Sequence, residues 1–100
     1  MITVMYAIYD EKSKVYNKPF AMINEAVAIR AVKDLTLDQN TEVGRHPMDF
    51  SLWELGTYDD ETANFVPYET KKLICMAHEI DAFNMSIDEQ NKEKIIEGVA

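Results

Sequence analysis

The chain of 100 residues has little of several residue types, and each shortage excludes a class of protein. A single cysteine, Cys75, cannot form a disulfide framework, and one cysteine with two histidines cannot supply the four nitrogen or sulfur ligands of a structural zinc site. With only three glycines, the chain has no glycine-rich loop to cradle a phosphate. The longest strictly apolar run, residues 73–77, is far too short to cross a bilayer.

The N-terminal residues do not resemble a secretion signal, because no basic residue precedes the apolar stretch that begins at Ile2 and no small-residue cleavage site follows it. Cys75 lies inside the apolar run, where we expect a buried thiol and not a ligand or nucleophile. Both observations suit a reducing compartment. We therefore expect a cytoplasmic protein without a membrane segment.

Positive charge is also scarce, since ten lysines and arginines stand against eighteen aspartates and glutamates, a net charge of −8. A surface of this sign opposes contact with phosphate backbones. The charge is uneven: residues 1–50 carry a net −1 and residues 51–100 a net −7. We therefore expect any nucleic-acid-binding surface in the first half. The acidic second half is typical of a solubilising surface, and it also suits nucleic-acid mimicry or contact with a basic partner protein.

The composition is otherwise that of a globular protein, with 47% hydrophobic and 28% charged residues and a length that suits one domain. Residues 2–10 are rich in β-branched and aromatic side chains. A polar break over residues 11–14 separates them from Val15 and Tyr16. This pattern predicts a first β-hairpin.

A helix and a second hairpin follow. Asn24 suits a helix N-cap, and apolar residues at three- and four-residue spacing over residues 28–35 predict a helix that lies on the sheet. Residues 51–58 resume strand character, residues 59–64 supply a turn, and a second strand begins at Phe65.

Three features of the second half are less regular. Gly56 interrupts a predicted strand and indicates a β-bulge or a close backbone approach. Residues 71–83 fit a helix by their apolar spacing and a buried strand by their first residues, and the length of the segment favours the helix. Ser86 and Glu89 have the spacing of a capping box, which predicts a short terminal helix.

Together these elements predict an α+β fold in a single domain. A small antiparallel sheet built from two β-hairpins packs against one main helix within residues 1–70, and residues 71–100 form a mainly helical C-terminal segment. A small sheet leaves its edges open to pairing, and ten aromatic residues provide apolar area to bury. We therefore also expect a homodimer.

The first predicted hairpin interleaves aromatic and basic side chains. Single-stranded nucleic acid is commonly bound by these two types, because bases stack on aromatic rings and cations neutralise phosphates. Tyr9 and Tyr16 are the predicted stacking residues. The predicted phosphate contacts are Lys12, Lys14, Lys18, Arg30 and Arg45. The alternative is that Tyr6 and Phe20 are core residues and that the lysines merely solvate a turn.

No catalytic site is visible, since no serine or cysteine has an activating partner in a recognisable motif, so we expect neither enzyme activity nor a cofactor. Asp10 is expected to stabilise the turn after the first strand through its side chain. His46 and Asp49 are spaced as metal ligands could be, but further ligands are lacking, so they predict a loop contact and no metal site. Trp53, the only tryptophan, is expected at the centre of the core, and the alternative is that it is a stacking residue.

A spaced pattern over the first two thirds of the chain carries a resemblance to a known family. The pattern comprises Met5-Tyr6-x-Ile8-Tyr9-Asp10, Pro19-Phe20, Asn24, Ala28-x-Arg30 and His46-Pro47-x-Asp49-Phe50-x-Leu52-x-x-Leu55-Gly56-x-Tyr58-Asp59. In order and spacing it resembles the small nonstructural protein of gokushovirus-type microviruses (Microviridae), which are icosahedral phages with single-stranded-DNA genomes. Residues from about Ala77 onward match nothing in that family.

The resemblance implies a nonstructural protein of the bacterial host cytoplasm that binds single-stranded DNA and assists genome-strand synthesis or packaging. The net charge leaves a second function open, that of an acidic regulatory protein that contacts a phage or host replication or packaging component without touching DNA. The first function predicts a DNA affinity that weakens with salt and depends on the first hairpin. The second predicts no DNA affinity and dependence on the acidic surface.

Overall fold

The computed structural model describes residues 1–80, and the terminal helix predicted from Ser86 lies outside the described residues. Along the chain the elements are β1 (Ile2–Asp10), β2 (Val15–Tyr16), β3 (Phe20–Met22), α1 (Glu25–Thr36), α2 (Glu42–Arg45), the 3₁₀ turn η1 (Pro47–Asp49), β4 (Phe50–Asp59) and β5 (Asn64–Met76). Within residues 1–80, no helix has the length and hydropathy needed to span a membrane.

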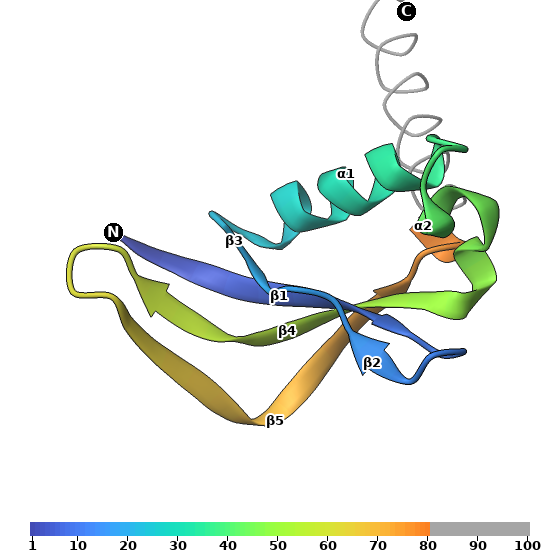
Figure 1. Cartoon of the computed structure of the whole chain (residues 1–100). Helices are drawn as coiled ribbons and strands as arrows, with labels where there is room; N and C mark the ends of the chain where they lie inside the picture. Colours follow the sequence, from blue (N-terminus) through green and yellow to red (C-terminus); the bar gives the residue numbers. More distant parts are fainter. Residues whose placement is uncertain (81–100) are drawn as a thin grey trace, which may run out of the picture.

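The five strands form one antiparallel sheet in the order β2-β1-β4-β5, and β3 also pairs with β1. β2 lies beside the end of β1 and β3 beside its first half, so two short strands share one edge of the sheet. Figure 1 shows α1 lying over one face of this sheet, with α2 on the same side. The opposite face has no covering helix among residues 1–80.

The structure overturns the predicted α+β class. Strands account for 46% of the described residues and helices for 26%, so a five-stranded sheet with one main helix dominates the fold. The helical segment predicted from residue 71 was wrong as far as Met76, because β5 continues to that residue. A short apolar run is compatible with either structure. Pairing with β4 decides between them here, since Leu52 is in register with Cys75 and Trp53 with Leu73.

α1 begins and packs as its sequence predicts. The side chain of Asn24 accepts a hydrogen bond from the backbone N–H of Val27 at 3.0 Å, which caps the first turn of the helix. Ala28 and Val32 are buried in one core cluster with Leu52 of β4. Full burial of a valine or leucine side chain stabilises a fold by about 1.5–3 kcal/mol, so this covered face holds the sheet and α1 together.

The two hairpin turns share one design. Asp10 in the first turn and Asp59 in the second each accept a bond, through a carboxylate oxygen, from the backbone N–H two residues later at 2.9 Å. In both turns the backbone N–H four residues later donates to the aspartate carbonyl at 2.8 Å. The donors of those second bonds, Lys14 and Ala63, both have a φ of 62°. The prediction that Asp10 stabilises the turn after the first strand is therefore confirmed.

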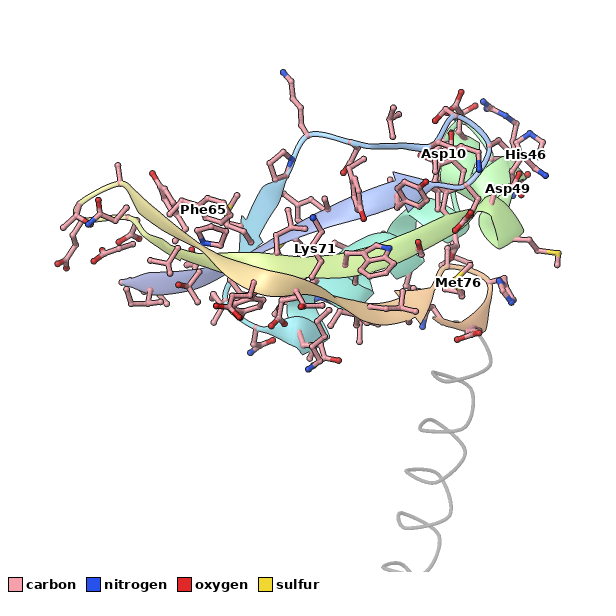
Figure 2. All side chains as sticks on the ribbon, turned by 90° about the horizontal axis from the view of Figure 1, so that it is seen from below. Asp10, His46, Asp49, Phe65, Lys71 and Met76 are labelled. Carbon is pink, nitrogen blue, oxygen red and sulfur yellow. The ribbon has the colours of Figure 1, made fainter. Side chains whose placement is uncertain are left out.

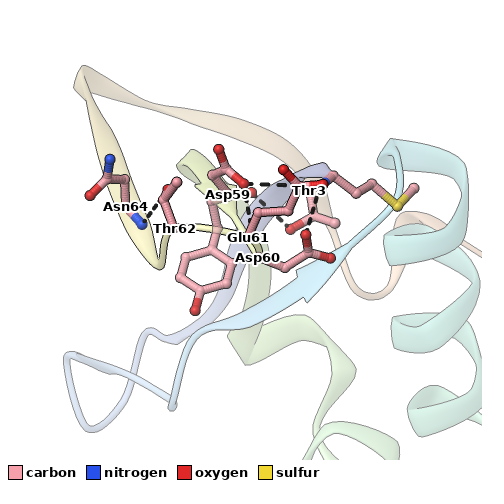
Figure 3. Close-up of polar contacts among 8 residues, drawn as sticks. Thr3, Asp59, Asp60, Glu61, Thr62 and Asn64 are labelled. Atoms are coloured by element: carbon pink, nitrogen blue, oxygen red, sulfur yellow. Dashed lines mark hydrogen bonds and ion pairs between the residues drawn. The ribbon is translucent and has the colours of Figure 1, made fainter.

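The β4–β5 turn gathers negative charge at the end of the sheet farthest from β2 (Figure 3). The ammonium group of Met1 donates a hydrogen bond to Asp60 at 2.6 Å and lies 3.9 Å from the carboxylate of Asp59 and 3.6 Å from that of Glu61. The hydrogen bond to Asp60 is the main reason that the pKa of this ammonium group is raised. These contacts tie the beginning of β1 to the turn.

Gly56 brings β5 close to β4. A Cβ atom at this position would lie 2.3 Å from the carbonyl oxygen of Val66 and 2.8 Å from Cα of Pro67, so no larger residue fits without a backbone shift. The register of β4 and β5 also changes between Glu54 and Gly56, which marks a β-bulge. Both features predicted for Gly56, a bulge and a close backbone approach, are therefore present.

The long outer edge of the sheet, along β5, carries features that disfavour pairing with another chain. Pro67 cannot donate a backbone hydrogen bond, and Lys71 and Lys72 place charge on the edge strand. The register change beside Gly56 makes this edge irregular as well. The homodimer that we expected from open edges stays a prediction.

Candidate functional site

The face of the sheet opposite α1 is the most unusual surface of the described residues. Side chains of directly paired residues lie on the same face of a sheet, so the register assigns each strand residue to one face. We call the face opposite α1 the open face. Its residues are Thr3, Met5, Ala7, Tyr9, Tyr16, Ser51, Trp53, Gly56, Tyr58, Phe65, Pro67, Leu73 and Met76. None of these paired residues is charged, although the chain carries a net charge of −8, and alternation along the unpaired residues 68–71 of β5 adds Glu69 and Lys71 to the same face.

Three aromatic rings meet at one end of the open face, and we call them the aromatic cluster: Tyr9, Tyr16 and Trp53. The ring centroids of Tyr9 and Tyr16 are 4.7 Å apart, and Trp53 meets Tyr16 edge-on at 6.4 Å. The indole N–H of Trp53 donates to the hydroxyl of Ser51 at 2.9 Å, which fixes the plane of the ring. Tyr16 remains 41% exposed, so the cluster is open to a flat ligand.

Trp53 was expected at the centre of the core, and that prediction was wrong. Its pairing with Ala7 and Leu73 places it on the open face, where it is only partly buried. The core is formed by residues of the opposite face, among them Tyr6 and Leu52, which are fully buried. A lone tryptophan in a strand does not reveal which face of the sheet is covered.

Tyr6 and Phe20 belong to that core and not to the site. The centroids of their rings are 6.1 Å apart on the side of α1. This agrees with the alternative that Tyr6 and Phe20 are core residues. Burial is the main reason, with the nearby carboxylate of Glu54 as the second, that the pKa of Tyr6 rises to about 12. The phenol therefore stays neutral. Its hydroxyl has no hydrogen-bond partner among the described residues.

The three lysines of the first hairpin do not share one environment. Lys14 ends the β1–β2 turn and Lys18 precedes Pro19, and both are exposed beside Tyr16 in the chain. Lys12 instead lines a surface hollow together with three carboxylates, those of Asp10, Glu42 and Asp49. Lys14 and Lys18 are thus the better placed cations of this hairpin, since Lys12 has acidic neighbours.

The structure does not bring Arg30 or Arg45 to the aromatic cluster. Arg30 is an exposed residue of α1, and Arg45 ends α2, where its guanidinium donates to the carbonyl of Gln39 at 3.1 Å. Both helices lie on the covered side of the sheet (Figure 1). The two arginines therefore lie behind the open face and do not extend it.

Asp10, His46 and Asp49 gather at one end of the molecule, where Figure 2 labels all three. The backbone N–H of Lys12, and to a smaller extent the nearby His46, holds the pKa of Asp10 below its ordinary value. The backbone N–H of Glu11 donates to the carbonyl of Asp49 at 2.8 Å. Residues 1–80 contain no group of three such side chains arranged to hold a metal ion. The contacts that the structure gives these residues are those of a turn and a loop.

Cys75 lies on the covered side and packs partly buried against the core. Burial raises the pKa of its thiol to about 11, so the thiolate is scarce at neutral pH. The small pocket beside it is lined by Glu25, Glu79 and apolar side chains, and a nearby carboxylate raises a thiol pKa further. These surroundings do not activate a nucleophile.

Lys71 is a residue that the sequence reasoning did not select. The residue after it, Lys72, is paired with Glu54 on the covered face, so the alternation of a strand turns Lys71 to the open face. Figure 2, which looks onto the open face, shows Lys71 in its middle, between Phe65 and Met76. Because residues 71–83 were predicted as a helix, the alternation of a strand could not be used to place Lys71 on a face.

A comparison with protein-family models matches residues 3–80 to the family described as phage ORF5 protein. Neither a curated protein nor a solved structure matches the chain. The matched residues include all five strands except Ile2, and the whole open face, and the match agrees with the phage origin that the resemblance implies. Because the family model spans well over half of the sequence, the chain belongs to the phage ORF5 protein family.

Proposed function

We propose that this phage protein binds single-stranded DNA on its open face and assists genome-strand synthesis or packaging of a gokushovirus-type microvirus. The observation that carries the proposal is the aromatic cluster, which lies at one end of the open face, and the exposed Lys14 and Lys18 are each two positions from Tyr16 in the chain. Stacking of one base on an aromatic side chain contributes about 1–3 kcal/mol by alanine substitution. Tyr9, Tyr16 and Trp53 are the stacking residues in this proposal.

The net charge of −8 is compatible with this function because of where the charges lie. A single DNA strand on the open face meets no carboxylate among the residues that are in register there, and Glu69 in the unpaired part of β5 is the carboxylate that alternation turns to this side. The acidic β4–β5 turn lies at the far end of β1 from the aromatic cluster, and exposed charges are largely screened beyond about 8 Å at physiological ionic strength. Repulsion therefore weakens binding overall without blocking the face.

A charge-reversal pair tests the proposal. Lys14→Glu with Lys18→Glu should weaken binding of oligothymidine and reduce the slope of log affinity against log salt, because two phosphate contacts are lost. Each lost contact to a single strand lowers the slope by about 0.7. The matched control is Arg30→Glu with Arg45→Glu, which changes the net charge equally on the covered side. Equal effects of the two pairs, or an effect of neither, would contradict the proposal.

One feature favours a second function, the acidic regulator without DNA contact. The end of the β4–β5 hairpin exposes apolar side chains, Phe65 at 47% and Val66 at 61%, beside the carboxylates of Asp60 and Glu61. Such a surface suits a basic protein partner. The regulator predicts no affinity for oligothymidine even at low salt, so the titration of the wild-type protein separates the two functions.

A further inference from the structure

β5 does not follow β4 evenly but forms an arch in its middle. On one side of the arch Gly56 is paired with Pro67, and on the other Glu54 is paired with Lys72. Residues 68–71 of β5 therefore stand opposite a single residue of β4, Leu55. Figure 1 shows the resulting sharp bend of β5 away from β4. The close approach at Gly56 fixes where the arch begins, because Val66 and Pro67, the last residues of β5 before the arch, lie against Gly56.

Glu54 is linked to both ends of the arch, through its carboxylate at one end and through strand pairing at the other. The hydroxyl of Tyr68, the first residue of the arch, donates a hydrogen bond to Oε2 of Glu54 at 2.9 Å. Lys72, the first residue after the arch, is the cross-strand partner of the same glutamate. Glu54 and Tyr68 thus hold the beginning of the arch on the covered side. Without this bond the arch could shift its register against β4.

The consequence of this geometry is the position of Lys71. Tyr68 and Lys72 are held toward the covered side, so Lys71, the last residue of the arch, faces the open side. On that side it lies between two groups of aromatic rings: the aromatic cluster and the cross-strand pair of Tyr58 with Phe65. By the same alternation Glu69, two residues before Lys71 in the arch, also faces the open side, so Lys71 is the cation of the open face and Glu69 is the carboxylate nearest to it in the chain.

We propose that Lys71 binds a backbone phosphate of the single strand, between bases stacked on the two aromatic groups, and that Glu54 and Tyr68 are the positioning residues that hold it there. This inference rests on the proposed function and names a contact that the first hairpin does not supply. Trp53 and Tyr58 are five residues apart on β4, about 17 Å at the rise of a strand. A strand that reaches both groups therefore spans several nucleotides, within the site sizes of about 4–16 that single-strand-binding domains occupy.

The experiment compares salt dependence among single variants, with fluorescent oligothymidine as the probe. Lys71→Ala should lower the slope of log affinity against log salt by about 0.7, the value for one phosphate contact to a single strand. Lys72→Ala is the matched control, because it removes the same charge from the neighbouring, covered-side position. Lys72→Ala should change the slope by less than half as much as Lys71→Ala does.

The positioning residues are tested through Lys71. Tyr68→Phe should reproduce the slope change of Lys71→Ala, and the double variant should show no further change, because both substitutions remove one contact. Glu54→Gln keeps an oxygen that accepts the Tyr68 hydroxyl and should retain the wild-type slope. Thermal unfolding of each variant shows whether it is folded, and the pair Lys71→Ala and Lys72→Ala decides the role of Lys71 if Tyr68→Phe does not fold.

Different results would overturn the inference about Lys71 and the proposed function on which it rests. A wild-type protein that binds oligothymidine with a slope unchanged by Lys71→Ala, or changed equally by Lys72→Ala, would overturn the inference and leave the proposed function standing. Additive effects of Tyr68→Phe and Lys71→Ala would overturn the positioning role alone. A wild-type protein without affinity for oligothymidine at low salt would overturn both.

Discussion

At the residue scale, the side-chain bonds that fix the start of α1 and the first hairpin turn are local ones. Asn24 caps α1 and Asp10 braces its turn as predicted, because each bond joins residues that are two or three apart. The roles of Trp53 and Lys71 depend instead on which face of the sheet is covered, and that is decided by residues far along the chain. Their surroundings could not be deduced from local pattern.

The positive φ of Ala63 gives a stability prediction. An L-residue in this left-handed conformation is strained by about 1–2 kcal/mol, and glycine relieves the strain at some cost in chain entropy. Ala63→Gly should therefore raise the free energy of unfolding by about 0.5–1 kcal/mol, measured by urea denaturation. The control Ala21→Gly, in β3 without a positive φ, should lower it. A loss of stability in both variants would contradict the turn geometry.

At the element scale, both hairpins, the helix and the irregularity at Gly56 are readable from sequence, while the extent of β5 is not. Apolar residues at 73–77 suit either a helix or a strand, and the length of the segment favoured the helix. The choice is made by pairing with β4, whose partner residues precede them by twenty positions or more. For the same reason the arch over residues 68–71 has no local signature, and the cation that it presents was missed.

The close packing at Gly56 predicts a large effect of a small substitution. Gly56→Ala places a methyl group within 2.3 Å of a backbone oxygen, so β4 and β5 must separate locally. The free energy of unfolding should fall by about 1–3 kcal/mol or more, as in other overpacked sites. Amide hydrogen exchange should also accelerate over Asn64–Met76. Wild-type stability and exchange in this variant would show that the two backbones are not in contact.

At the scale of the whole molecule, the two faces of the sheet have different chemistry. One face is buried beneath α1 and carries the core, whereas the other presents aromatic rings and, from the unpaired part of β5, Glu69 and Lys71. Negative charge is concentrated elsewhere, notably at the β4–β5 turn. In the proposed function the single strand lies on the second face, and only its end at Tyr58 and Phe65 adjoins the acidic turn.

The most direct test of that claim uses the only tryptophan of the chain, Trp53, which belongs to the open face. Titration of the protein with oligothymidine at low salt should quench the intrinsic tryptophan emission to a saturable limit, because a base stacks on the indole. Added salt should reverse the quenching, and a duplex of the same length should cause much less. Unchanged emission at low salt, at concentrations that saturate other single-strand-binding proteins, would contradict a DNA-binding open face.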